Sequence, residues 1–295
     1  MTMTQIAQPG APDYSARATL PIRVELIRQL RRRRTLIGYL LVIALPIIVA
    51  IAVKFGPSSD GGSNNGRGFG SGSADLVGLA TSSAANFTVT MLFFASGFLL
   101  VVIVALFCGD TVASEASWSS LRYLLAAPVP RRRLLRSKLI VGLLLSLGAI
   151  IVLPIAAFVV GWIAFGLGPL QSPLGGTFST ADSLLRIAGI CAFLFLSLLF
   201  AAGLAFLMSV LTDAPLGAVG ATVVLVIVSN ILEAIEALGV IREWLPTHYA
   251  SSWLGLLSPE VDWTPLARGT AYAVVTFAIF VTIAIIRFDR KDIVS

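Results

Sequence analysis

Residues 109–138 read GDTVASEASWSSLRYLLAAPVPRRRLLRSK and form a strongly polar segment between two apolar runs of membrane-spanning length. The segment carries six of the 21 Lys and Arg residues of the chain. Its apolar residues Trp118, Leu121 and Leu125 recur at steps of three and four, with Leu124 beside them. This spacing predicts a short amphipathic helix with one apolar face.

Two prolines, Pro128 and Pro130, follow this helix and are expected to end it. Proline removes a backbone donor and restricts the residue before it. The segment is therefore interpreted as a two-turn helix on a basic loop between two membrane spans. Its apolar face can enter a groove on a partner protein. Alternatively, it lies among lipid headgroups with its arginines on phosphates.

The composition places the chain among membrane proteins. Hydrophobic residues make up 57% of the sequence, charged residues 12%, and the mean hydropathy is +0.93. A soluble domain with so few charges could not cover so much apolar surface. The net charge of +6 does not indicate nucleic-acid binding, because the basic residues cluster at the ends of apolar runs, where they orient a chain in the bilayer. Cys108 and Cys191 lie in or at the end of such runs and are interpreted as small buried hydrophobes.

The apolar runs predict an all-α polytopic membrane protein with six transmembrane helices. The domain organisation is a cytoplasmic tail with an amphipathic interface helix (1–34), a six-span domain (35–287) and a cytoplasmic tail (288–295). No cleavable signal peptide is expected, since the first apolar run lacks a small-residue cleavage site. The spans are predicted at about 35–53, 87–108, 139–165, 184–211, 215–235 and 270–286.

The segment before the first span, residues 20–34, has apolar residues on one helical face, namely Ile22, Leu26, Ile27 and Leu30. A helix of this kind is expected to lie in the membrane interface. Four arginines end the segment, and we expect them to anchor it on anionic headgroups: Arg31, Arg32, Arg33 and Arg34.

No nucleotide-binding motif occurs in the chain. The Gly- and Ser-rich loop 57–75 predicts a flexible linker, because no Lys-Ser/Thr pair follows its glycines. The chain itself is therefore not expected to be an enzyme, and ATP-driven work would need a separate ATPase. Residues 236–268 contain three of the five tryptophans among apolar pieces too short to cross a bilayer, which predicts short interfacial or re-entrant helices.

The distribution of basic residues predicts the orientation. If both termini and residues 109–138 face the cytoplasm, 16 basic residues lie inside and five outside. This asymmetry favours cytoplasmic termini and an even number of spans.

Few polar residues are candidates for a site. Glu233 and Glu236 are predicted to share a helical face near the outer boundary, either as carboxylates that reach water or as a polar rim of a substrate path. His248 lacks partners at metal-ligand spacing and is interpreted as a hydrogen-bonded polar residue; no metal site is predicted. Asp110 and Glu115 are expected to pair with arginines of their own loop or with basic residues of a partner.

The same segment, 109–138, resembles a signature of bacterial ABC-2 type transporter permeases. The resemblance rests on Glu115, the Ser119-Ser120-Leu121 turn, Leu124-Leu125, Pro128-Val129, Arg131 and Lys138. Ser119 stands where the family usually has glycine, and Pro130 where it usually has serine. The six-span layout extends the resemblance over nearly the whole chain.

In that family the segment is a coupling helix between the second and third spans that docks on the ATP-hydrolysing subunit. The resemblance therefore implies a permease subunit of an ATP-binding cassette exporter in the bacterial plasma membrane. It would form the substrate path with a second copy or a similar permease, and a cytoplasmic subunit would bind ATP and Mg²⁺. The contact residues implied are Glu115, Trp118, Leu121, Arg122, Leu124, Leu125 and Pro128. The alternative is a membrane scaffold or anchor for a cytoplasmic partner without transport.

Overall fold

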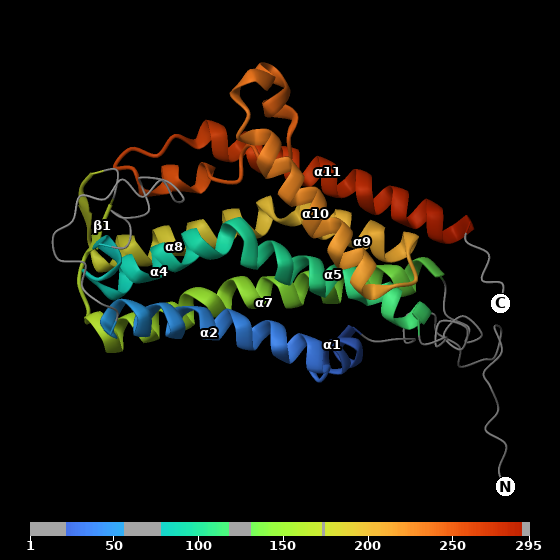
Figure 1. The fold of residues 1–295 in the computed structure, drawn as a ribbon, viewed down its shortest axis with the longest axis horizontal. Coiled ribbons are helices and arrows are strands. Elements are labelled where there is room, and N and C mark those ends of the chain that lie inside the picture. The colour runs from blue at the N-terminus through green and yellow to red at the C-terminus, as the bar shows by residue number, and fades with distance from the viewer. Residues whose placement is uncertain (1–21, 56–77, 118–130, 173–174, 291–295) are drawn as a thin grey trace, which may run out of the picture.

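The computed structural model describes residues 22–55, 78–117, 131–172 and 175–290, and these residues are mostly helical (Figure 1). Six helical segments are long and apolar enough to cross a membrane. This confirms the predicted all-α polytopic membrane fold. The segments are α2 (Arg33–Phe55), α4 with α5 (Ala84–Phe94 and Leu100–Ser117), α7 (Arg131–Phe165), α8 with α9 (Thr180–Ser197 and Leu199–Leu211), α10 (Pro215–Glu233) and α11 (Trp263–Arg290).

Helix α5 occupies the centre of the bundle, where it packs against α2, α7, α9 and α10. The core around it includes Leu100, Ile103 and Phe107, each at most 4% exposed. The spans α2, α10 and α11 are the least buried, and many of their apolar side chains point outward. Lipid tails are as apolar as leucine, so outward-facing apolar residues are stable in a membrane.

Glycines in α7 allow two neighbouring helices to approach closely. A Cβ at Gly142 would lie 3.1 Å from the carbonyl oxygen of Phe107 in α5. A Cβ at Gly161 would lie 3.1 Å from Cα of Ala84 in α4. Any larger residue at these positions would push α7 away from its neighbours.

Two of the spans are not continuous α-helices. The second contains a π-helical turn, η1 (Ala95–Leu99), between α4 and α5. The fourth is distorted at Leu198, where ψ is −4°, between α8 and α9, and the hydrogen bonds Leu198 N–H to Leu194 O and Ala202 N–H to Leu198 O continue across this break in regular geometry. Neither irregularity is visible in the sequence, because hydropathy is insensitive to one inserted or displaced residue within an apolar run.

Several helices extend beyond the predicted spans. Helix α5 continues to Ser117 and α7 begins at Arg131, although residues 109–117 and 131–138 are predicted to belong to the loop. Helix α11 begins at Trp263, seven residues before the predicted span. Hydropathy locates the part of a helix that lies in hydrocarbon, whereas backbone hydrogen bonding continues into polar sequence.

The segment between α10 and α11 contains short 3₁₀ helices, η2 (Glu236–Trp244) and η3 (Ser252–Leu257). The prediction of short helical pieces in this segment is confirmed. A short helix that precedes the first span, α1 (Ile22–Leu30), is also present. Two two-residue strands, β1 (Leu170–Gln171) and β2 (Thr177–Phe178), pair antiparallel between α7 and α8.

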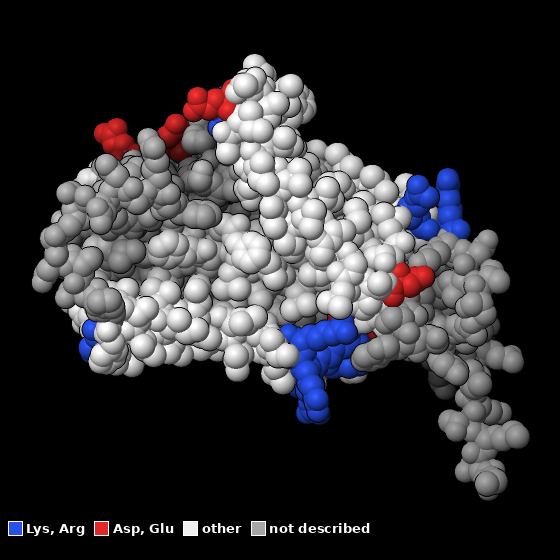
Figure 2. All heavy atoms as spheres, viewed as in Figure 1, with Lys and Arg blue, Asp and Glu red and all other residues white. Residues whose placement is uncertain are grey.

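Most of the described basic residues lie at one end of the bundle (Figure 2). This end, called the basic end below, carries α1, the starts of α2 and α7, and the ends of α5 and α11 (Figure 1). Its described basic side chains are Arg23, Arg28, Arg31, Arg32, Arg33, Arg34, Arg132, Arg133, Arg136, Lys138, Arg287 and Arg290. The opposite end carries exposed acidic residues, namely Glu236, Glu243, Glu260 and Asp262.

Candidate functional site: a buried ion network at the basic end

Helix α1 turns its polar side toward the bundle. Glu25 and Gln29, one turn apart, are 3% and 5% exposed. The predicted apolar stripe is largely the outer face, with Ile22, Ile27 and Leu30 exposed. A soluble amphipathic helix would place these faces the other way round. The inversion is stable where the outer face meets lipid and the inner polar groups find charged partners.

Lys138 is the centre of the charged cluster that α1 contacts. This residue, in the second turn of α7, is 1% exposed. Its Nζ lies 2.6 Å from Oε1 of Glu115 at the end of α5 and 3.5 Å from Oε1 of Glu25 in α1. Both carboxylates are also nearly inaccessible, with side chains 2% and 4% exposed. One lysine therefore joins three elements that are distant in sequence.

Arg28 of α1 gives the two carboxylates a second cation. Its Nη2 lies 2.7 Å from Oε2 of Glu25 and donates a hydrogen bond to Oε1 of Glu115. Gln29 Nε2 donates a further hydrogen bond of 3.1 Å to Glu25. The two buried carboxylates thus share two buried or half-buried cations, which offsets the cost of removing four charges from water.

Asp110, one turn before Ser114 in α5, holds the start of α2. Arg34 Nη1 donates to its Oδ1, and Arg32 Nη1 lies 3.5 Å from its Oδ2. Arg32 also donates a hydrogen bond of 3.1 Å to Oγ of Ser114. The charged residues of these contacts form two neighbouring sets on α5, around Glu115 and around Asp110. Together they are called the ion network below: Glu25, Arg28, Arg32, Arg34, Asp110, Glu115 and Lys138.

The pKa values of Glu25 and Arg28 in α1 depend on these neighbouring charges. Burial acts to raise the pKa of Glu25, but the positive charges of Lys138 and Arg28 outweigh it and hold the pKa below its ordinary 4.5. Burial acts to lower the pKa of Arg28, and the carboxylates of Glu25 and Glu115 reverse that effect and raise it. Both groups therefore stay charged at neutral pH.

The structure gives several of these residues partners within the chain. Glu115, expected to pair with arginines of its own loop or with basic residues of a partner, is buried and bonds to Lys138 and Arg28, because α5 continues past it and α1 covers it. Arg32 and Arg34, expected to anchor lipid headgroups, pair with Asp110; Arg31 and Arg33 are exposed. The other predicted contact residues, Trp118, Leu121, Arg122, Leu124, Leu125 and Pro128, lie outside the described residues.

Sequence reasoning missed the ion network because its members come from segments 25–34, 110–115 and 138. One signal was available: Glu25 and Gln29 lie four residues apart, on the side of α1 away from the apolar stripe. Lys138 also stands at the start of an apolar run, where a lysine commonly reaches toward water. Here it cannot, because α1 covers it.

The opposite end has a smaller polar cluster. Glu233 Oε1 lies 3.2 Å from Nη2 of Arg242 and 3.0 Å from Nδ1 of His248. This confirms that His248 is a hydrogen-bonded polar residue. Glu236 does not share a helical face with Glu233, because α10 ends at Glu233 and Ile235 is extended. In the described part of the chain, no group of three His, Cys, Asp or Glu could hold a metal ion.

These observations define an all-α, six-span membrane protein whose basic end is held by a buried ion network. The family model described as "Protein of unknown function (DUF2705)" matches residues 64–294. Because the match covers most of the chain, the protein belongs to this family. A comparison with curated proteins gave no match.

Proposed function

We propose that this chain is the permease subunit of an ATP-binding cassette exporter of the ABC-2 type. It would work as a dimer with a second copy or a similar permease, in the bacterial plasma membrane. A separate cytoplasmic subunit would bind ATP and Mg²⁺ and drive it. The observation that carries the proposal is the ion network, because it joins the two helix ends between which residues 118–130 are inserted.

The geometry supports a route for mechanical coupling. Helix α5 ends at Ser117 and α7 begins at Arg131, so a partner that pulls on residues 118–130 pulls on both helices. The Glu115–Lys138 pair holds these two helix ends together. Since α5 packs against α2, α7, α9 and α10, its movement is passed to most of the bundle.

Helix α1 adds to the same unit. Along the chain, α1 is separated from residues 118–130 by α2 and the second span. Through ion pairs, however, Glu25 contacts α7 and Arg28 contacts α5, the two helices that flank residues 118–130. A force applied to residues 118–130 would therefore also be transmitted to α1 and, through Asp110, to the start of α2. This arrangement favours a docking function over a passive lipid contact.

The orientation follows from the charges. Basic residues gather at one end of the bundle, which favours the cytoplasmic side for that end and for both termini. We expect a cysteine in place of the exposed Glu260 to react with an impermeant thiol reagent in intact cells, and one in place of Arg132 to react only after permeabilisation. The reverse labelling would contradict the docking assignment.

Recruitment of an ATPase is the direct test. The neighbouring genes would first be searched for a Walker-motif ATPase, and the candidate found there would be co-expressed and captured through a tag on the permease, at matched expression. Leu121→Asp with Leu125→Asp removes the apolar face, and burying each leucine contributes about 1.5–3 kcal/mol, so capture should be largely lost. Arg132→Gln is the control, because this exposed side chain pairs only with Asp289 among the described contacts. Full capture by the double aspartate variant would assign this apolar face to lipid and overturn its role in coupling.

At the opposite end, Glu233 and Glu236 are proposed as part of a polar rim where substrate leaves. Glu233 is held by Arg242 and His248, whereas Glu236 is exposed. Glu233→Gln with Glu236→Gln should change transport and leave ATPase recruitment intact. Unchanged transport would show that the two carboxylates only reach water or headgroups and do not line the substrate path.

A further inference from the structure

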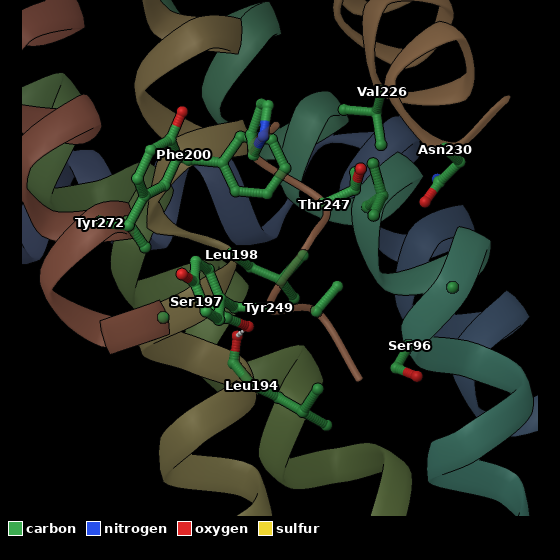
Figure 3. A pocket seen from close by; sticks show the side chains of 16 residues that line it. Ser96, Leu194, Ser197, Leu198, Phe200, Val226, Asn230, Thr247, Tyr249 and Tyr272 are labelled. Atoms are coloured by element: carbon green, nitrogen blue, oxygen red, sulfur yellow. Dashed lines mark hydrogen bonds between the residues drawn. The ribbon is translucent and has the colours of Figure 1, made fainter. Parts of the chain in front are cut away.

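A cavity lies among the spans (Figure 3). Its walls come from η1 and the start of α5, the α8–α9 junction, the last turns of α10, residues 246–250 and the second and third turns of α11. The polar side chains that line it are Ser96, Ser197, Asn230, Thr247, Tyr249 and Tyr272.

Both interruptions of the spanning helices face this cavity. The π-helical turn η1 supplies Ser96 and Gly97, and the break between α8 and α9 supplies Ser197 and Leu198. π-Turns within α-helices are frequent at functional sites, because they re-aim side chains without ending the helix. Two independent irregularities that line one cavity indicate a place where the bundle is shaped for something other than tight packing.

The charges of the lining restrict the ligand. None of the described residues that line the cavity is Asp, Glu, Lys, Arg or His. A charged group that entered would lose its hydration without gaining a counter-charge, which is costly in a membrane interior. The ligand group that fits is therefore uncharged.

The hydroxyl groups restrict it further. Ser96 Oγ donates 2.9 Å to the carbonyl of Phe93, Ser197 Oγ donates 3.1 Å to that of Leu194, and Tyr272 donates to that of Trp244. A hydroxyl has one proton and two acceptor lone pairs. Because these protons are already used, the three oxygens present acceptors, which match a ligand that brings O–H or N–H donors.

The volume of the cavity limits how much of a ligand can enter it. The interior volume is about 40 Å³, which accommodates a group of a few non-hydrogen atoms or a few waters. Apolar side chains, among them Val101, Leu194 and Val226, surround the polar ones. Most of the lining belongs to the membrane-spanning helices, and residues 246–250 complete it.

We infer that this cavity binds the hydroxyl-bearing end of an uncharged amphiphile, such as a monoacylglycerol, whose hydrocarbon chain stays in the bilayer. As an assignment of the transported class, this rests on the proposed function. Binding itself does not, since every residue invoked belongs to this chain.

The test uses the purified full chain in phosphatidylcholine nanodiscs without any ATPase. Three photoactivatable probes with the same oleyl-length diazirine chain would be compared: a monoacylglycerol, a fatty acid and a primary amine. The monoacylglycerol should label peptides with cavity residues saturably, about tenfold more strongly than either charged probe. Equal labelling by the three probes, or stronger labelling by a charged one, would overturn the inference.

Two glycines provide a matched pair of variants. A Cβ at Gly97, which lines the cavity, or at Gly220, which does not, would meet no atom within 4 Å. Gly97→Leu should therefore fill the cavity and reduce monoacylglycerol labelling about tenfold, whereas Gly220→Leu should leave it unchanged. Equal labelling of the two variants would contradict monoacylglycerol binding in this cavity.

Ser197→Ala provides a second, milder variant that removes one acceptor and little volume. It should reduce labelling several-fold while the chain elutes as the unmodified protein in gel filtration, and it decides the matter if Gly97→Leu does not fold. Undiminished labelling of Ser197→Ala would contradict the acceptor argument. Failure in this assay leaves ATPase recruitment untouched, and loss of recruitment by the Leu121→Asp/Leu125→Asp variant leaves this binding untouched.

Discussion

The two ends of the bundle each pair carboxylates with basic residues, but they do so in different ways. At the basic end, Lys138 and Glu115 have side chains 1% and 2% exposed, and their contacts join α1, α5 and α7. At the opposite end, the side chain of Glu233 is 21% exposed, and its partners Arg242 and His248 follow within 15 residues. The carboxylates at the basic end are thus more deeply buried, and their partners lie farther away in the sequence.

This difference indicates different roles. A buried pair between distant segments fixes how whole helices sit relative to one another, and breaking it leaves an uncompensated charge. A partly hydrated pair within one segment shapes that segment only, and water can replace a lost partner. The basic end is therefore suited to transmit movement, and the opposite end to adjust locally.

The largest effect is expected from Lys138→Met. It leaves Glu115 and Glu25 buried with only Arg28 as a cation, so we expect a loss of about 3–5 kcal/mol in stability. The measurement is thermal unfolding of the detergent-solubilised protein. Arg132→Gln is the control, because Arg132 is exposed and its pair with Asp289 contributes at most about 1 kcal/mol. Similar losses in the two variants would remove the distinction between the ends.

A second change tests whether the first effect arises from the ion pair. Adding Glu115→Gln to Lys138→Met leaves Arg28 with one carboxylate to compensate instead of two, so part of the lost stability should return. A coupling of about 0.5–3 kcal/mol between the two substitutions is expected for residues in one network. Strict additivity in the double-mutant cycle would show that Lys138 acts through packing alone.

The pH dependence of stability provides a third test. Because the pKa of Glu25 is below 4.5 in the folded protein, its ionised form stabilises the fold at higher pH. That contribution should be complete above the ordinary pKa and be lost as pH falls through the lower folded value. Unfolding midpoints measured from pH 7 down to acid should therefore fall less in Glu25→Gln than in the unmodified protein. Parallel curves would contradict the assigned ion pairs.

The smallest effect is expected at the opposite end. Glu233→Gln keeps a hydrogen-bonding group beside Arg242 and His248, and a pair that is partly open to solvent contributes about 0–1 kcal/mol. The unfolding midpoint should change little in the assay used for Lys138→Met. A loss as large as that of Lys138→Met would show that both ends are held equally tightly.

Six apolar runs, the amphipathic segment before the first span and the asymmetry of basic residues are visible in the sequence alone. They suffice because the bilayer imposes its own rule: only a helix of sufficient apolar length satisfies its backbone within hydrocarbon. The same rule explains why hydropathy placed the spans and yet misplaced the helix ends at Ser117, Arg131 and Trp263. Beyond the hydrocarbon, length is set by local hydrogen bonding and tertiary contacts.

Tertiary structure decided the partners of the charged residues. In sequence, Glu115 and Lys138 read as polar groups of one loop, and Glu25 as part of the solvated face of an amphipathic helix. Their burial depends on α1 folding back over the ends of α5 and α7, which no local pattern specifies. The tertiary structure also brings η1 and the break at Leu198 together at one cavity. The sequence does not show this, because hydropathy averages over the few residues whose displacement forms the cavity.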